Sequence, residues 1–228
     1  MHRAFFIAGT DTDVGKTTIA AGLLHAARLA GLSTAAVKPV ASGCERTEQG
    51  LRNSDALALL AECSLALDYA TVNPFAFEPA IAPHIAAREA GVELTAARLI
   101  EAVQPVMARQ AGVTLVEGAG GWRVPLNARE YLSALPAALG LPVILVVGVR
   151  LGCINHALLS AEAIARDGLA LAGWVANIID PATSRLDDNL ATLAELLPAP
   201  CLGQVPRLAA PTARQVARYL TLPALQPV

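Results

Sequence analysis

Lysine is nearly absent from this chain of 228 residues, which has fifteen arginines but only two lysines, Lys16 and Lys38. Arginine therefore serves wherever a general positive charge is enough. A lysine kept against this bias is a candidate for a role that needs a compact ammonium with mobile donors, because a planar guanidinium cannot imitate it. The two lysines are thus the first candidates for an active centre.

Other absences exclude whole classes of protein. A net charge of −2 leaves no basic field that would suggest nucleic acid or an anionic membrane as a partner. The longest apolar stretch, Ala137–Val149, is interrupted by glycine and proline and is too short to span a bilayer. Only Ala4–Ala8 is apolar before Gly9, which indicates a first strand and not a secretory signal. We therefore expect a cytoplasmic protein that binds neither membrane nor nucleic acid.

The cysteines are few, widely spaced and without a CxxC pair; they are Cys44, Cys63, Cys153 and Cys201. This spacing predicts neither a zinc site nor a disulfide framework and is typical of a reducing compartment. Cys153, with His156 nearby, is a candidate nucleophile, although a buried cysteine explains the position more simply.

The apolar pattern is that of an α/β protein, with short apolar runs alternating with longer helical ones. Strands are expected at Ala4–Ala8, Ser33–Val37, Val113–Val116, Val143–Val147, Leu171–Asn177 and Leu202–Val205. Helices are expected over Lys16–Ala30, Ala56–Glu62 and Thr95–Gln110, from the turn at Gly152 to Asp167, and ending at Leu197. The proline-spaced segment Asn73–His84 is predicted to be an ordered surface loop over a cleft. We predict a single domain over residues 1–228, with a doubly wound, mostly parallel sheet of the P-loop nucleotide-binding type.

Polar residues follow several of these strands. Sheets of this kind bind ligands at the carboxyl ends of their strands. The residues at predicted strand ends are Lys16, Lys38, Glu117, Gly152 and Asn177. They are therefore expected to converge on one rim of the sheet, although more than a hundred residues separate some of them.

The segment Gly9–Thr17 reads GTDTDVGKT and is a glycine loop of the phosphate-binding type. In such loops backbone N–H groups and a helix N-terminus hold phosphate oxygens, lysine reaches the outer phosphates and the next hydroxyl, here Thr17, ligates magnesium. Five residues instead of four separate Gly9 from Gly15, and Thr10 takes the place of the usual first glycine. The alternative is a glycine-bearing turn that binds nothing.

Asp55 and Glu117 are the candidate carboxylates for magnesium, which takes oxygen ligands from carboxylates, phosphate and water. Glu117 follows an apolar strand, where nucleotide enzymes place an acidic residue. Its carboxylate could instead be satisfied by neighbouring glycine N–H groups, and Asp55 could simply cap a helix.

Three further segments at strand ends have a functional and a structural explanation. Lys38 either stabilises charge on a moving phosphoryl group or is a solvated strand-end lysine. Gly118–Gly121 either admits a phosphate closely or is a tight turn. Gly152–Asn155 opens a helix that could receive a substrate carboxylate, or Asn155 is an ordinary N-cap. Asn177 could read a nucleotide base; the guanine-reading Asn-Lys-x-Asp pattern is missing, which favours ATP over GTP.

Seven segments together resemble the dethiobiotin synthetase family, and they run through most of the chain in that family's order. They are Gly9–Thr17, Lys38–Gly43, Leu51–Asp55, Asp68–Pro74, Val116–Trp122, Val146–His156 and Ala172–Asn177. The resemblance implies an ATP-dependent cyclo-ligase of biotin biosynthesis. Such an enzyme joins carbon dioxide to 7,8-diaminopelargonate as a carbamate, phosphorylates the carbamate with ATP and closes the ureido ring with the second amine.

The resemblance also implies a set of site residues. Nucleotide-binding residues would be Asp13, Val14, Gly15, Lys16, Thr17, Thr18, Asp55, Glu117, Gly118, Ala119, Gly120, Asn177, Ile178, Pro206, Arg207 and Leu208. Mg²⁺ would be held by Thr17, Asp55 and Glu117, and the catalytic residues would be Lys38 and Lys16. Substrate-binding residues would be Thr12, Lys38, Ser42, Gly121, Gly152, Cys153 and Asn155. The last three would act from a partner subunit, which implies a homodimer.

The sequence departs from the family's pattern at three positions. Asp13 stands where glutamate is frequent and Arg150 where lysine is often found. Asn189 lies where well-known members have a tyrosine near the substrate tail, so recognition of the substrate carboxylate is expected to differ. The segment Asn127–Leu139 matches weakly and supports no assignment.

Two other functions share this loop chemistry. A nucleotide-switched ATPase of the partitioning type would have an additional lysine early in the phosphate loop, where this chain has Thr10 and Asp11. An amide-forming synthetase of corrin biosynthesis would need a glutamine-hydrolysing domain, for which 228 residues leave no space. Dependence on carbon dioxide instead of glutamine distinguishes the cyclo-ligase from the second alternative.

Overall fold

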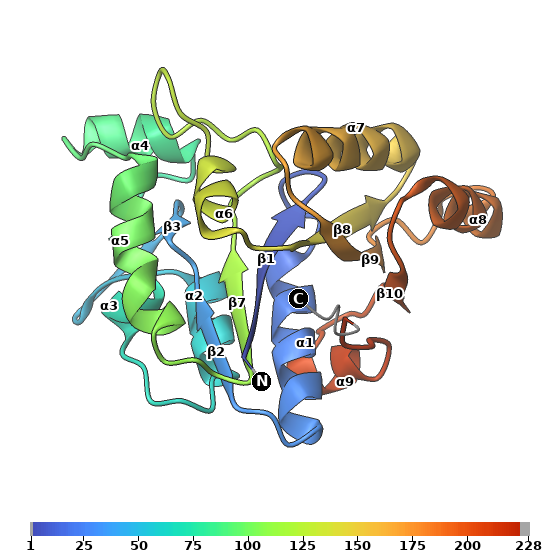
Figure 1. The fold of residues 1–228 in the computed structure, drawn as a ribbon, viewed down its shortest axis with the longest axis horizontal. Coiled ribbons are helices and arrows are strands. Elements are labelled where there is room, and N and C mark those ends of the chain that lie inside the picture. The colour runs from blue at the N-terminus through green and yellow to red at the C-terminus, as the bar shows by residue number, and fades with distance from the viewer. Residues whose placement is uncertain (1, 224–228) are drawn as a thin grey trace.

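Six parallel strands form the central sheet, in the order β10-β9-β8-β1-β7-β2. The computed structural model, which describes residues 2–223, is shown in Figure 1. The strands are β1 (Arg3–Gly9), β2 (Thr34–Val37), β7 (Val113–Glu117), β8 (Val143–Val149), β9 (Leu171–Ile178) and β10 (Cys201–Val205). Because β1 pairs with both β7 and β8, it lies at the centre, and the chain winds outward from it in both directions.

Helices cover both faces of this sheet, and each face has its own apolar core. One core joins Ile7 of β1 to α1 (Lys16–Leu29), α2 (Ser54–Ala61) and α9 (Ala213–Ala217). The other joins Phe6 of β1 to α5 (Ala96–Met107), α6 (Ala134–Leu139), α7 (Cys153–Arg166) and α8 (Leu186–Leu196). Neighbouring residues of β1 therefore point to opposite cores, as the two-residue period of a strand requires. The predicted doubly wound α/β fold is confirmed.

The sequence-based boundaries agree closely for the long elements. The segment Asn73–His84, predicted to be an ordered surface loop, contains regular secondary structure. Its residues Phe75–Ala76 form β6, which pairs in parallel with β3 (Val40–Ala41). Pro83 begins α4 (Pro83–Glu89), where its fixed φ suits a first helical position. The expected order of this segment is therefore present, but it includes a short strand and the first turn of a helix, which the prediction of a loop did not include.

Smaller elements complete the chain. They are the hairpin of β4 (Glu45–Thr47) and β5 (Gly50–Arg52), and the one-turn helix α3 (Tyr69–Val72). Over residues 2–223, no helix combines the length and the apolarity that a membrane crossing requires. All four cysteines are free, and Cys153 is buried at the start of α7.

Candidate functional site

The loop between β1 and α1 is shaped to receive an anion. Asp13 (φ 57°) and Gly15 (φ 86°) both have left-handed backbone conformations on either side of Val14, which is buried. Such alternation turns successive N–H groups toward one concave side. No side chain caps the first turn of α1, so its N–H groups stay available. The Lys16 ammonium donates to the Asp11 carbonyl at 3.0 Å and lies across the loop.

Burial lowers the pKa of Lys16, and the nearby Lys38 ammonium adds to this effect, while Glu117 opposes it. Lys16 therefore lies in a partly desolvated pocket, where an ammonium interacts strongly with an anion.

Asn177, near the end of β9, contacts this loop through its side chain. Its side-chain amide donates to the Val14 carbonyl at 2.8 Å. A Cβ added at Gly15 would lie 2.3 Å from the same amide nitrogen. Asn177 thus packs against Gly15, where the loop has no side chain, and it ties the end of β9 to the phosphate loop.

A second group of polar side chains meets beside the loop. Lys38, directly after β2, donates to Glu117 Oε1 at 2.6 Å and to Asp55 Oδ2 at 2.9 Å. The Thr17 hydroxyl donates to the same Glu117 oxygen at 2.7 Å. Glu117 is 0% exposed and Lys38 is 4% exposed. Four residues that span a hundred positions therefore form one cluster, which we call the Lys38 centre.

Charge pairing holds the Lys38 centre together. Burial alone would lower the pKa of Lys38, but Glu117 and Asp55 more than offset it and raise that pKa above its usual value. Burial would likewise raise the pKa of Asp55, but Lys38 holds it below the usual range. An ammonium that is charged, buried and beside the phosphate loop can stabilise negative charge that develops nearby.

The structural explanations of these residues are not supported. Asp55 is not the cap of α2, because Asn53 occupies that position and its side chain accepts from the Ala56 N–H at 3.2 Å. The Glu117 carboxylate is held by Lys38 and Thr17, and no glycine N–H among residues 2–223 donates to it. Lys38 is buried and not solvated.

The Lys38 centre suits a hard divalent cation. The second oxygen of Glu117 is buried and has no hydrogen-bond partner within residues 2–223. Together with Asp55 and the Thr17 hydroxyl it offers the oxygen ligands that Mg²⁺ prefers. No cluster of three histidine, cysteine, aspartate or glutamate side chains that could hold a metal occurs in the described chain. A cation here would therefore need further ligands from phosphate and water.

A cavity of about 180 Å³ opens on the other side of the phosphate loop. Its walls come from the loop, from the end of β9 and from the segment after β10. Eight predicted nucleotide-binding residues line it: Asp13, Gly15, Thr18, Asn177, Ile178, Pro206, Arg207 and Leu208. The sequence analysis missed three further lining residues, Ile179, Val205 and Pro211. Val205 ends β10 and Ile179 follows β9. The argument that ligands bind at the carboxyl ends of the strands therefore applies to both residues.

The glycine run after β7 lies against the phosphate loop. A Cβ at Gly118 would lie 2.8 Å from the Phe6 ring, and Gly120 has a left-handed φ of 59°. A Cβ at Gly121 would lie 3.6 Å from the Gly9 carbonyl. The glycine run is therefore a tight turn, which is the structural explanation. It also lies close to the phosphate loop, which the functional explanation requires.

A partly buried contact anchors the residues after the glycine run to the C-terminal end of α7. Trp122 donates from its indole to Asp167 Oδ2 at 2.9 Å. Arg123 donates to both oxygens of the same carboxylate, at 2.7 and 2.8 Å. Burial would raise the pKa of Asp167, but the bonds from Arg123 and Trp122 hold it below its usual value. The carboxylate of Asp167 thus positions the residues that follow Gly121.

The Asp167→Asn variant is expected to lose about 2 kcal/mol of unfolding free energy at neutral pH, because hydrogen bonds to a charged group are weakened. Because the pKa of Asp167 is lower in the folded protein than in the unfolded one, its carboxylate stabilises the fold at any pH above the unfolded pKa of about 3.9. This stabilisation is lost as the pH falls through the pKa of Asp167 in the folded protein. Urea unfolding from neutral pH down to about pH 3 should therefore show the two proteins converging. Glu101→Gln, at an exposed position of α5, is the control. A loss that is independent of pH would contradict the assignment.

The start of α7 is separate from the Lys38 centre within one chain. Gly152 is the N-cap with φ 94°, and Asn155 is inside the helix, so the interpretation of Asn155 as the N-cap is wrong. No hydrogen bond or ion pair within the described residues joins Gly152, Cys153 or Asn155 to Lys38, Asp55 or Glu117. Arg150 connects this turn to the phosphate loop through an ion pair with Asp11 at 2.7 Å. Neither residue of that pair was predicted as a site residue.

Three other positions from the sequence analysis are placed as follows. The Ser42 hydroxyl is buried without a hydrogen-bond partner in the described part of the chain. Asn189 lies in α8 and donates to the carbonyls of Ser184 and Arg185. Its amide is therefore engaged with the start of its own helix. Thr12 lies near the glycine run, because a Cβ at Gly120 would be 3.7 Å from its hydroxyl.

The parallel sheet and the phosphate loop define a P-loop nucleotide-binding protein. Solved structures agree: a ParA family ATPase from Chlorobium tepidum has a TM-score of 0.56 at 12% identity, covering 96% of this chain and 98% of its own. The septum site-determining protein MinD from Pyrococcus horikoshii has a TM-score of 0.54 at 17% identity, covering 90% and 82%. These likenesses support the fold alone. The family model described as "AAA domain" matches residues 3–215.

Curated relatives give a narrower family. The chain is 78% identical to the ATP-dependent dethiobiotin synthetase BioD of Pseudomonas paraeruginosa, over 96% of both chains. It is 60% identical to the protein of the same name from Cellvibrio japonicus, again over 96% of both. The chain therefore belongs to the ATP-dependent dethiobiotin synthetase family, the ATP-dependent cyclo-ligases of biotin biosynthesis.

Proposed function

We propose that this protein converts 7,8-diaminopelargonate, carbon dioxide and ATP into dethiobiotin, ADP and phosphate. The observation that carries the proposal is the Lys38 centre, a buried ammonium between two carboxylates beside a phosphate loop. Family membership supplies the substrate class, and the geometry supplies groups that suit phosphoryl transfer.

In this proposal one amine of the substrate attacks carbon dioxide and loses a proton, which gives a carbamate. A carbamate oxygen then attacks the outer phosphorus of ATP, and ADP leaves. The second amine attacks the carbonyl carbon of the mixed anhydride and loses a proton, phosphate leaves, and the ureido ring closes. Lys16 and the N–H groups of Asp13–Thr18 hold the ATP phosphates, and Lys38 stabilises charge on the transferred group.

Mg²⁺ is part of the proposal, with Thr17, Asp55 and Glu117 as its protein ligands. When bound, it would neutralise charge on the outer ATP phosphates. The buried, unpartnered oxygen of Glu117 supports this assignment. The cavity beside Asn177 and Pro206–Leu208 is proposed to take the adenine.

The substrate is proposed to lie between the Lys38 centre and a second copy of the chain. The unpartnered Ser42 hydroxyl, Thr12 and Gly121 are its proposed contacts near the reacting amines. Its carboxylate would meet the Gly152–Asn155 turn of the second copy. The neighbouring Leu151 is 93% exposed, which suits a turn that inserts into a partner. A monomer in sedimentation equilibrium with substrates present would remove this homodimer from the proposal.

The test is to incubate the protein with the diamine, MgATP and ¹³C-labelled bicarbonate and to analyse the products by mass spectrometry. The expected result is a cyclic urea that contains one labelled carbon, with one ADP formed for each ring closed. Omitting the diamine should suppress ADP formation. ATP turnover without the labelled urea would refute the proposed substrate.

A further inference from the structure

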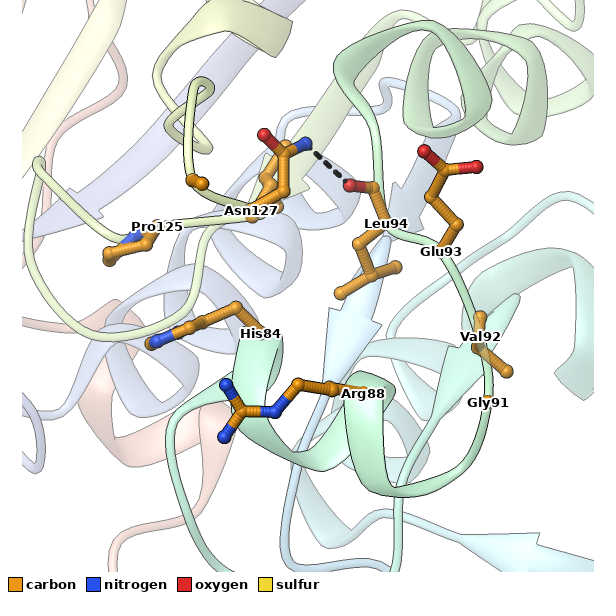
Figure 2. A pocket seen from close by; sticks show the side chains of 10 residues that line it. His84, Arg88, Gly91, Val92, Glu93, Leu94, Pro125 and Asn127 are labelled. Atoms are coloured by element: carbon orange, nitrogen blue, oxygen red, sulfur yellow. Dashed lines mark hydrogen bonds between the residues drawn. The ribbon is translucent and has the colours of Figure 1, made fainter.

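A second and larger cavity has a volume of about 690 Å³ and contains no residue of the Lys38 centre in its lining. Figure 2 shows it between α4, the loop Gly91–Leu94 and the loop Pro125–Ala128. None of its lining residues belongs to the nucleotide, metal or substrate positions assigned above. It is therefore a separate feature of the fold, and its chemistry can be considered independently.

Asn127 holds the two walls of this cavity apart and in place. Its amide nitrogen donates to the Leu94 carbonyl at 2.8 Å, the bond drawn in Figure 2, and to Glu130 at 2.7 Å. Its amide oxygen accepts from the backbone of Arg129 and Glu130. The polar groups of Asn127 are thus committed to the walls, and the cavity is preformed.

One end of the cavity offers cationic and hydrogen-bonding groups without partners. His84 and Arg88 are four residues apart on α4 and so share a helix face, and Figure 2 shows their side chains next to each other. The ring atom Nδ1 of His84 is buried and has no hydrogen-bond partner within residues 2–223. Arg88 forms no ion pair with another described residue. The carboxylate of Glu93 points away from Arg88 in Figure 2.

The rest of the lining is apolar and includes Val92, Leu94, Pro125 and Leu126. Val92 and Pro125 are partly exposed and offer apolar surface to the cavity, whereas Leu94 and Leu126 are buried behind it. A phosphate dianion would leave charge facing these apolar groups, at a high cost. An aliphatic chain would contact them favourably, and an anionic group at one end of the chain would reach Arg88 and His84.

We propose that this cavity binds an aliphatic monocarboxylate, with its carboxylate on Arg88 and His84 Nδ1 and its chain along Val92 and Pro125. His84 donates from Nδ1 to one carboxylate oxygen, and the Arg88 guanidinium donates to the other. The proposal goes beyond the proposed function and does not depend on it.

The test is titration calorimetry of the full-length protein with octanoate, acetate and octanamide, without ATP. Octanoate should bind saturably, while acetate lacks the chain and octanamide lacks the charge, so both should bind at least about tenfold more weakly. Arg88→Gln should weaken octanoate binding by about tenfold or more. Arg214→Gln, at an exposed position of α9, is the matched control and should bind octanoate as the wild-type protein does. An unchanged thermal midpoint of Arg88→Gln confirms that the variant is folded.

Location is tested by amide chemical shifts, because octanoate also resembles the chain of the proposed substrate. Shifts at Gly91–Leu94 and at Asn127 are expected. Shifts confined to Gly152–Asn155, or equal affinity of the wild-type protein and Arg88→Gln, would overturn the proposal. Arg88→Gln should still form the labelled urea, so failure of this proposal is distinguishable from failure of the proposed function.

Discussion

Replacement of Lys38 by alanine is expected to reduce turnover by about a thousandfold or more, because in the proposed mechanism it removes the charge that faces the transferred phosphoryl group. The Lys38 ammonium lies 2.6 Å from Glu117 and 2.9 Å from Asp55 and is almost fully buried. Lys38→Arg should not restore the rate, since a planar guanidinium needs more room and a different donor geometry. The measurements are ADP release and labelled urea formed per second. Arg28→Gln, on α1 with an exposed side chain, is the control and should keep normal turnover.

Loss of Lys38 is also expected to destabilise the fold, by about 3–5 kcal/mol, since it leaves the fully buried Glu117 carboxylate without its cation. This effect can be separated from catalysis with the double variant Lys38→Ala/Glu117→Gln, which removes both charges. The double variant should regain much of the thermal stability and none of the turnover. A Lys38→Ala protein that is folded, binds ATP and turns over at a near-normal rate would contradict the role given to Lys38.

The strand-end argument predicted most of this site from the sequence. Glu117 ends a fully buried strand and Lys38 follows another, and parallel neighbours must bring such ends to one edge. The strand order, in which β7 lies between β1 and β2, explains why these two residues meet Thr17. The rarity of lysine pointed to Lys38, but the rarity alone does not reveal its partners.

Choices between adjacent residues could not be made from the sequence. Asn53, Ser54 and Asp55 are all good N-cap residues, and only the backbone angles decide which of them takes that position. Asn53 has an extended backbone, φ −110° and ψ 129°, and therefore caps α2. Asp55 is then free to turn toward Lys38. Whether Asp55 is available to a metal therefore depends on where α2 begins, because the N-cap is Asn53 and not Asp55 two residues later.

Short segments held by distant contacts were also beyond prediction. β3 and β6 have two residues each, which is too few for any periodicity to show, and each is a strand only because the other is present. The loop Pro125–Ala128 gave no recognisable pattern, although it forms one wall of the second cavity. Its shape depends on Asn127 reaching Leu94, thirty-three residues earlier in the chain.

Replacement of Gly15 by alanine is expected to weaken nucleotide binding by about a hundredfold or more, which corresponds to a loss of roughly 3 kcal/mol. Two physical causes act together. The φ of 86° is unfavourable for any residue with a Cβ, and the new methyl group would lie 2.3 Å from the Asn177 amide nitrogen. Asn177 would have to release the Val14 carbonyl, and the loop would lose the shape that directs its N–H groups to phosphate. Binding of a fluorescent ATP analogue measures the effect.

Gly31→Ala separates a local effect on the phosphate loop from general destabilisation by backbone strain. Gly31 has a similar φ of 77°, with nothing within 4 Å of the added Cβ, and it follows the opposite end of α1. Its alanine variant should lose about 1–3 kcal/mol of stability from backbone strain and bind nucleotide normally. If Gly31→Ala weakened nucleotide binding as much as Gly15→Ala, general destabilisation would explain both results.

In the double variant Gly15→Ala/Asn177→Ala the clash is removed while the strain stays, so stability should recover in part. Nucleotide binding should stay weak, because the amide that holds the Val14 carbonyl is then missing and the loop has no support from β9.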